Sequence, residues 1–305
     1  MGYMMRKREN LASYVSICAS MLIFGSIGIF RKYLPVPSGF LALSRAVTGA
    51  LFLLAVTVLG RRRIDKASVK RNLPLLCMTG VCLGANWILL FEAFEYTSVS
   101  VATLCYYMAP VIIILSSALF LREGLTIQKV LCSVGALFGM ILVSGIASGE
   151  MPGKADSIGI LLGLCAAVLY ASVVIINKKI TDISPYDKTV VQLSAAAVVM
   201  LPYVLICEDV SAVTFDVRMV ILLAVVGIVH TGIAYALYFG ALRSVKAQSA
   251  ALISYVDPAS ALVMSAVFLG ERLEPYGIIG AVLILVFAAM AEIDIGAFIR
   301  KKVAK

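Results

Sequence analysis

Long runs of apolar residues, separated by short polar stretches, repeat along the whole chain. A helix of about 20 apolar residues can cross the roughly 30 Å hydrocarbon core of a bilayer. Ten such runs are present, so the pattern predicts an all-α integral membrane protein with ten transmembrane helices. We expect these helices at residues 12–34, 38–59, 73–95, 99–121, 127–147, 157–178, 189–207, 218–241, 247–269 and 276–296.

The composition agrees with a membrane protein. Hydrophobic residues make up 62% of the chain and charged residues 14%, whereas soluble domains contain about 45–50% and about 25%. Such an excess of apolar surface needs lipid as its solvent. The seven cysteines are scattered without metal-ligand spacing, so we expect no metal site and no cofactor.

Basic residues predict the orientation, because loops rich in Lys and Arg stay in the cytoplasm. One side of the predicted spans, which includes both chain ends, carries twenty Lys and Arg, and the other side carries five. We therefore expect a multi-pass protein of the bacterial inner membrane with both termini in the cytoplasm. The net charge of +9 follows from this topology, and we expect no nucleic acid as a partner.

The chain also repeats itself at an offset of 148 residues. Matching pairs include aromatic, proline and acidic positions, namely Phe91 and Phe239, Tyr107 and Tyr255, Pro110 and Pro258, and Glu123 and Glu271. This predicts two halves, 1–148 and 149–305. Each half holds five spans, so the second half would cross the membrane in the opposite sense. Such 5+5 inverted-topology repeats are typical of secondary transporters.

Two copies of one motif resemble the EamA family of the drug/metabolite transporter superfamily. The first reads Tyr-Met-Ala-Pro at 107–110 and Phe-Leu-Arg-Glu at 120–123. The second reads Tyr-Val-Asp-Pro at 255–258 and Phe-Leu-Gly-Glu-Arg-Leu at 268–273. The resemblance implies ten helices around a central cavity that moves small metabolites across the inner membrane. The first copy departs from the family pattern at Arg122, where the family has glycine.

Charged residues inside spans are costly and usually face a cavity or a partner. Asp257 lies about 15 Å into its span, near the midplane, and is a candidate for a substrate or proton site. It could instead form a structural pair with Arg45 of the second span. Glu92 could couple protons or attract a cationic substrate, or it could reach the membrane interface together with Glu95.

Other candidates are less specific. His230, the only histidine, could titrate near neutral pH or could make an ordinary interhelical hydrogen bond. Pro110 and Pro258 lie within spans and free the carbonyls of Tyr106 and Ser254, which predicts kinks that serve either gating or packing alone. Eight polar or aromatic residues could cage an amine by cation–π contact or could simply pack: Asn86, Trp87, Tyr106, Tyr107, Gln192, Tyr235, Tyr238 and Tyr255.

These patterns favour a secondary transporter of a small organic metabolite, working by alternating access. The intramembrane acids and aromatics favour an amino acid or another amine, and the family resemblance favours export with protons as the coupling ion. The alternatives are a channel for a small solute and a membrane-embedded enzyme, although the chain contains no Walker A motif or nucleophile elbow. We expect a monomer or a homodimer in the lipid bilayer.

Overall fold

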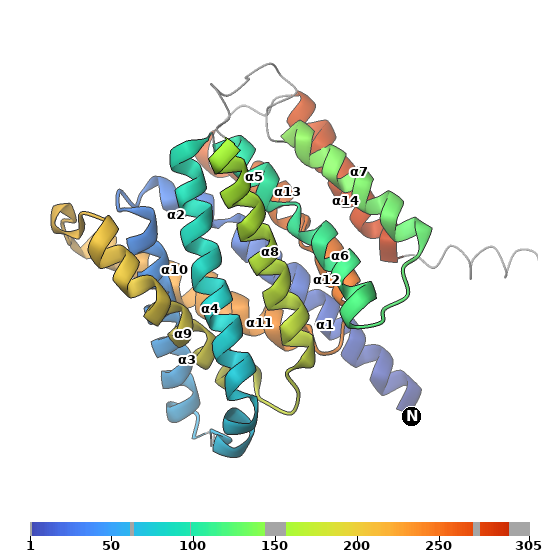
Figure 1. Cartoon of the computed structure of the whole chain (residues 1–305), viewed down its shortest axis with the longest axis horizontal. Coiled ribbons are helices and arrows are strands. Elements are labelled where there is room, and N and C mark those ends of the chain that lie inside the picture. The colour runs from blue at the N-terminus through green and yellow to red at the C-terminus, as the bar shows by residue number, and fades with distance from the viewer. Residues whose placement is uncertain (1, 62–63, 98, 144–156, 271–274, 293–305) are drawn as a thin grey trace, which may run out of the picture.

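The computed structural model of the chain describes residues 2–61, 64–97, 99–143, 157–270 and 275–292. Its regular elements in these ranges are helices (Figure 1). They are α1 Gly2–Gly25, α2 Ile27–Lys32, α3 Ser38–Leu59, α4 Lys66–Tyr96, α5 Val99–Tyr106, α6 Ala109–Phe120, α7 Ile127–Val143, α8 Ser157–Lys179, α9 Pro185–Cys207, the 3-10 helix η2 Val210–Ala212, α10 Val217–Gly227, the π-helix η3 Ile228–Ile233, α11 Ala234–Ala241, α12 Ala247–Ile253, α13 Val256–Leu269 and α14 Pro275–Glu292.

Eight helical segments of the described chain are long and apolar enough to cross a membrane. The chain is therefore a multi-pass membrane protein. Two further apolar helices, α7 and α14, contain 17 and 18 residues. They pack against each other at one edge of the bundle (Figure 1) and begin at residues 127 and 275, which are 148 positions apart. The prediction of ten spans thus rests on these two shorter helices.

Several of the spans are interrupted. The span of α5 and α6 breaks at Tyr107 and Met108, and the span of α12 and α13 breaks at Ser254 and Tyr255. A proline lies in the first turn after each break, Pro110 as the second residue of α6 and Pro258 as the third residue of α13. Proline suits the first turn of a helix because it has no backbone N–H to donate. The Ser254 carbonyl accepts the Asp257 amide at 3.2 Å, so the prediction that proline leaves this carbonyl free is wrong.

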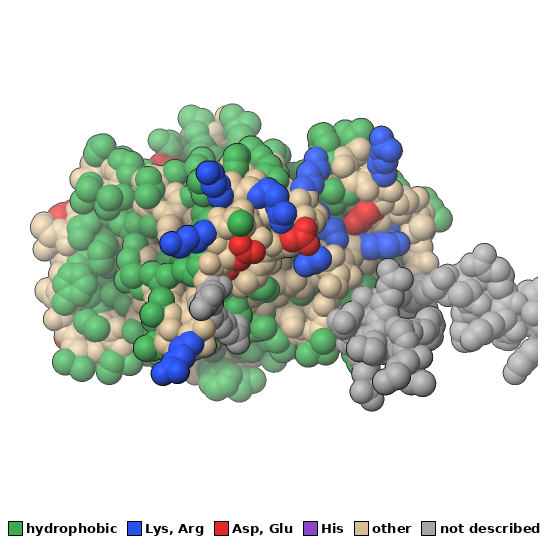
Figure 2. All heavy atoms as spheres, turned by 90° about the horizontal axis from the view of Figure 1, so that it is seen from below, with side chains coloured by type: hydrophobic (Ala, Val, Ile, Leu, Met, Phe, Trp, Pro, Cys, Tyr) green, Lys and Arg blue, Asp and Glu red, His purple; other side chains and the backbone are tan. Residues whose placement is uncertain are grey.

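The bundle has two ends, which we name by a residue at each. The Tyr33 end carries the connections 33–37 and 208–216, and the Glu123 end carries the connections 121–126, 180–184 and 242–246. Figure 2 views the Glu123 end, which lies at the bottom of Figure 1, and shows Lys, Arg, Asp and Glu side chains gathered across it. Hydrophobic side chains surround this charged region, as expected where a bundle leaves the bilayer.

Acidic side chains cap helix starts in two different ways. Asp65 caps its own helix, α4, by accepting the Ala67 and Ser68 amides, both at 3.1 Å. Hydrogen bonds from the Ser68 hydroxyl and amide lower the pKa of Asp65 below its ordinary value. Glu208 instead caps a different helix, since it accepts the amides of Gly39 and Phe40 at the start of α3.

Glu123 also caps a distant helix. Its carboxylate accepts the Ala247 amide at 2.9 Å and the Gln248 amide at 3.2 Å, at the start of α12. The position of Glu123 just before α7 suggests a role at that nearer helix, but the anion lies at the positive end of another helix from the other half of the chain. The two halves of the chain are therefore joined by part-buried hydrogen bonds at the Glu123 end.

Candidate substrate site

A cavity of about 580 Å³ lies in the middle of the bundle. Its wall combines α1, α2, α3, α4, α5, α6, α8, α11 and α13, together with the two helix breaks. From mid-bundle it reaches toward the Tyr33 end, where Arg31, Phe94 and Thr103 line it. The breaks matter here, because backbone that leaves a helix within the membrane needs a cavity or protein around it.

Asp257 lies in this cavity one residue before Pro258, in the first turn of α13. The Tyr107 hydroxyl lies 3.5 Å from its carboxylate, and the Tyr255 hydroxyl donates to the Tyr107 carbonyl at 3.3 Å. Tyr107 and Tyr255 are repeat counterparts, 148 positions apart. The two broken spans therefore meet through their equivalent tyrosines, and only the second half has an acid at this meeting point, since the counterpart of Asp257 is Ala109.

Arg45 of α3 lines the same cavity. Its Nε donates to the Thr231 hydroxyl at 3.0 Å, and its guanidinium lies 5.3 Å from the centre of the Trp87 ring. No carboxylate of the described chain lies within 4.0 Å of it. The pair with Asp257 that the sequence left open is therefore not a direct ion pair in this structure.

The wall around Asp257 depends on a close approach of α1 to α13. A Cβ added to Gly25 would lie 2.1 Å from the Ser260 hydroxyl and 2.7 Å from the Asp257 carbonyl. Any larger side chain at this position must push α1 away from α13. Gly28, one turn further along the same wall, is different, because a Cβ added there would meet no atom within 4 Å.

Aromatic side chains form much of the remaining wall. Of the eight polar or aromatic candidates, Tyr106, Tyr107 and Tyr235 line the cavity. Trp87 stands behind it, with its ring centre 6.0 Å from that of Tyr235. Tyr170, which was not among the candidates, also lines the cavity, and its ring centre lies 5.8 Å from that of Tyr106. Tyr170 could have been predicted as a candidate because it is an aromatic residue within a predicted span.

The other candidates lie outside the cavity lining. The Asn86 amide donates to the Ala166 carbonyl at 2.6 Å, and Gln192 donates to Thr79 and Asn177. These contacts join α4 to α8 and α9. Tyr238 is fully buried in the core.

Two titratable candidates also face elsewhere. Glu92 accepts a hydrogen bond from the Tyr203 hydroxyl at 2.7 Å, which ties α4 to α9. His230 sits in the π-helix, where its Nε2 lies 2.9 Å from the Ser26 hydroxyl, and its ring packs against Phe30. The sequence left an interhelical hydrogen bond open for His230, and this is the contact that it makes.

At the Glu123 end, two lysine side chains tie neighbouring elements of the bundle together. The Lys188 ammonium donates to the Phe239 carbonyl at 2.8 Å, and the Lys178 ammonium donates to the carbonyls of Leu242 and Val245 at 2.9 and 2.8 Å. These lysines, from α9 and α8, hold the end of α11 and the turn that follows it. Lys188 is 4% exposed, so its hydrogen bond is protected from water.

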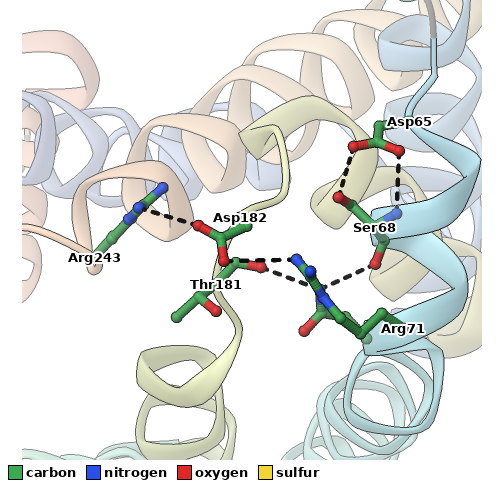
Figure 3. Close-up of polar contacts among 7 residues, drawn as sticks. Asp65, Ser68, Arg71, Thr181, Asp182 and Arg243 are labelled. Carbon is green, nitrogen blue, oxygen red and sulfur yellow. Dashed lines mark hydrogen bonds and ion pairs between the residues drawn. The ribbon is translucent and has the colours of Figure 1, made fainter.

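An exposed ionic bridge lies at the same end. Figure 3 shows Asp182, in the connection between α8 and α9, placed between Arg71 and Arg243. The separations are 3.6 Å to Arg71 and 3.5 Å to Arg243, and all three side chains are about 60% exposed. Solvent weakens such pairs, so the buried lysine bonds contribute more to holding this end together than this bridge does.

The structure defines an all-helical, multi-pass membrane protein, and the family comparison names its class. Two stretches, residues 11–145 and 157–292, match the model of the EamA-like transporter family. The chain therefore belongs to the EamA-like transporter family. The resemblance stated from the motifs at 107–123 and 255–273 is confirmed.

Similar proteins support the same assignment. The chain is 32% identical over 287 residues to the uncharacterized transporter YxxF of Bacillus subtilis, covering 93% of this chain and 90% of that protein. It is 25% identical to an uncharacterized transporter of Archaeoglobus fulgidus, covering 88% and 92% of the two chains. A crystal structure with 18% sequence identity superposes with a TM-score of 0.82 over 94% of this chain and 96% of its own, which shows the shared fold.

Proposed function

We propose that this protein is a secondary transporter that exports a small organic metabolite carrying an amine, such as an amino acid, by alternating access. The observation that carries the proposal is the mid-bundle cavity that contains Asp257 and is lined toward the Tyr33 end by Arg31, Phe94 and Thr103. A buried carboxylate among tyrosine rings suits an ammonium group, which gains both ionic and cation–π contacts there.

Repeat counterparts support a cavity that alternates between the two ends. Phe94 and Thr103 line the cavity near the Tyr33 end, and their counterparts 148 residues later are Leu242 and Ala251. Both counterparts are 0% exposed and belong to the packed core near the Glu123 end. Because the two halves share one fold in opposite orientations, exchange of their conformations would open the second end and close the first.

The charge distribution supports an orientation. Twenty Lys and Arg against five favour an orientation with the Glu123 end and both termini in the cytoplasm. In that orientation the cavity faces outward and the lysine bonds close the cytoplasmic side. We take residues 1–148 and 149–305 as the two halves, with α7 and α14 as the fifth and tenth spans.

Proton coupling is the part of the proposal that rests on Asp257 alone. A carboxylate that binds either a proton or a substrate ammonium, but not both, makes the two compete for one site. Competition of this kind exchanges protons for substrate across the membrane without ATP.

The test uses purified protein in liposomes. Vesicles loaded with one amine or amino acid from a metabolite panel are given a pH gradient, and substrate efflux is followed for wild type and for Asp257→Asn. A transporter shows saturable efflux that an opposing substrate accelerates, and Asp257→Asn loses the dependence on the pH gradient. Flux that does not saturate and ignores opposing substrate indicates a channel, and conversion of the solute into a product indicates an enzyme.

A further inference from the structure

Besides Asp257, which the proposed function assigns to the substrate amine, the cavity is lined by the charged side chain of Arg45, which has no role in that proposal. Arg45 faces the cavity, and only its Nε has a hydrogen-bond partner in the described part of the chain, the Thr231 hydroxyl. The two terminal nitrogens of the guanidinium, with four N–H donors, therefore have no acceptor among the described residues. A guanidinium inside a membrane protein with no carboxylate beside it costs free energy, unless a ligand supplies the missing hydrogen-bond acceptors.

The surroundings hold this arginine in one orientation. The Trp87 ring lies beneath the guanidinium at 5.3 Å, and Thr231 fixes one edge of it. Thr231 is in turn fixed by its own hydrogen bond to the carbonyl of Val226, five residues earlier, a spacing that belongs to the π-helix. π-helical turns are rare and are frequently found at functional sites. The two terminal nitrogens of the Arg45 guanidinium are therefore held in a fixed orientation.

Close backbone packing brings the two elements within reach. A Cβ added to Gly227 would lie 2.5 Å from the Thr48 side chain, and one added to Gly49 would lie 3.0 Å from the Gly227 carbonyl. Helix α3 therefore rests directly on the last residue of α10 and on the π-helix that follows it, about one turn after Arg45. Without these glycines Thr231 would lie too far away to hold the guanidinium.

We infer that Arg45 binds a carboxylate of the substrate, so that Arg45 and Asp257 together select a zwitterion. This inference rests on the proposed function, because it assigns the amine to Asp257. An arginine fork matches the two oxygens of a carboxylate. A single carboxylate fits better than a phosphate, because the other arginine of the lining, Arg31, already donates to the Leu34 and Val36 carbonyls.

The two charges are separate, which is what a zwitterion requires. Asp257 has Tyr107 as its side-chain partner and Arg45 has Thr231, and no direct ion pair joins the two. A substrate with one ammonium and one carboxylate would satisfy both groups without adding net charge to the cavity. An amine without an acid would leave Arg45 without a partner.

The experiment compares matched ligands on the full-length protein in detergent. The probes are L-leucine with 3-methylbutylamine and 4-methylpentanoate, L-phenylalanine with phenethylamine and 3-phenylpropionate, and the remaining amino acids as a panel. Binding is read by thermal stabilisation and titration. We expect a zwitterion to bind wild type, and Arg45→Gln to weaken it at least tenfold while leaving the affinity for the matching amine within about twofold.

Two further variants keep the result interpretable. Arg45→Lys retains the charge but loses the fork, and we expect it to lose at least fivefold in affinity for the zwitterion. Arg218→Gln removes an arginine that also lies 5.3 Å from an aromatic ring, that of Tyr33, but outside the cavity lining, and the affinity should not change. A purely structural Arg45 would weaken the zwitterion and the amine equally, which overturns the inference.

The outcomes also separate this inference from the proposed function. Zwitterion binding that depends on Asp257 but not on Arg45 overturns the inference and leaves the transporter proposal standing. Zwitterion binding that depends on Arg45, without efflux from liposomes, overturns the transporter proposal instead. A panel in which no carboxylate compound stabilises wild type also overturns the inference.

Discussion

Replacing Lys188 by methionine tests whether the buried lysine bonds keep the Glu123 end closed. Methionine fills a similar volume but cannot donate a hydrogen bond. The change removes the bond from the Lys188 ammonium to the Phe239 carbonyl, which is 2.8 Å long and lies at a residue that is 4% exposed. This bond belongs to the closed arrangement, because it joins α9 to the end of α11, which must separate if the cavity is to open at this end.

The size of the effect follows from the kind of bond. A hydrogen bond to a charged group contributes about 1.5–3 kcal/mol. A difference of about 1.4 kcal/mol changes an equilibrium constant tenfold. Losing the bond should therefore raise the population open at the Glu123 end by about ten- to a hundredfold relative to the closed one.

The assay is the reactivity of a cysteine placed where only the open arrangement exposes it. All seven native cysteines are replaced first, and Ala251, which is fully buried, is changed to cysteine. In detergent both ends meet the reagent, so the maleimide reaction rate reports conformation alone. Lys188→Met should raise the rate at Ala251→Cys at least tenfold and lower it at Thr103→Cys, which lines the cavity near the Tyr33 end.

The control is Lys246→Met, since Lys246 lies at the same end of the bundle with an exposed side chain. It should change neither rate. Equal labelling of Ala251→Cys with and without Lys188→Met would refute the closing role of the lysine. So would an equal increase with Lys246→Met.

Three further changes have expected outcomes that thermal unfolding can check. Gly25→Ala places a Cβ 2.1 Å from the Ser260 hydroxyl and should lower the free energy of unfolding by about 1–3 kcal/mol. Gly28→Ala is the control, because its Cβ meets no atom within 4 Å, and it should change the melting temperature little. Equal losses of stability in the two variants would contradict the close packing at Gly25. Glu123→Gln keeps its shape but loses the charge at the start of α12, and should destabilise by about 0.5–2 kcal/mol. Asp182→Asn should cost under about 1 kcal/mol, because its partners are exposed, and the loss should shrink further at high salt.

Local patterns were enough to predict the membrane class, the repeat and the family. Apolar runs mark helices because each helix satisfies its own backbone, and a charge within such a run is conspicuous. Asp257 and Arg45 were identified in this way, and both line the cavity. The breaks beside Pro110 and Pro258 follow from proline chemistry in the same local manner.

Features that depend on which helix lies opposite could not be predicted from one sequence. Glu92 is as conspicuous in its run as Asp257, yet it faces Tyr203 on α9. Glu123 lies before α7 but caps α12, more than a hundred residues away. The π-helix that places Thr231 leaves no mark in composition, because one extra residue in a helical turn changes no residue type.

In the proposed carrier, the lysines at the Glu123 end would give a duplicated fold a preference for one of its two conformations. Duplication alone would give two equivalent gates, but the counterparts of Lys178 and Lys188 in the first half are Phe30 and Phe40, which have no donor for a carbonyl. The resting side of the carrier would then be set by two side chains rather than by its architecture. Exchanging lysine and phenylalanine between these paired positions would be a direct way to build a carrier that rests facing the opposite side.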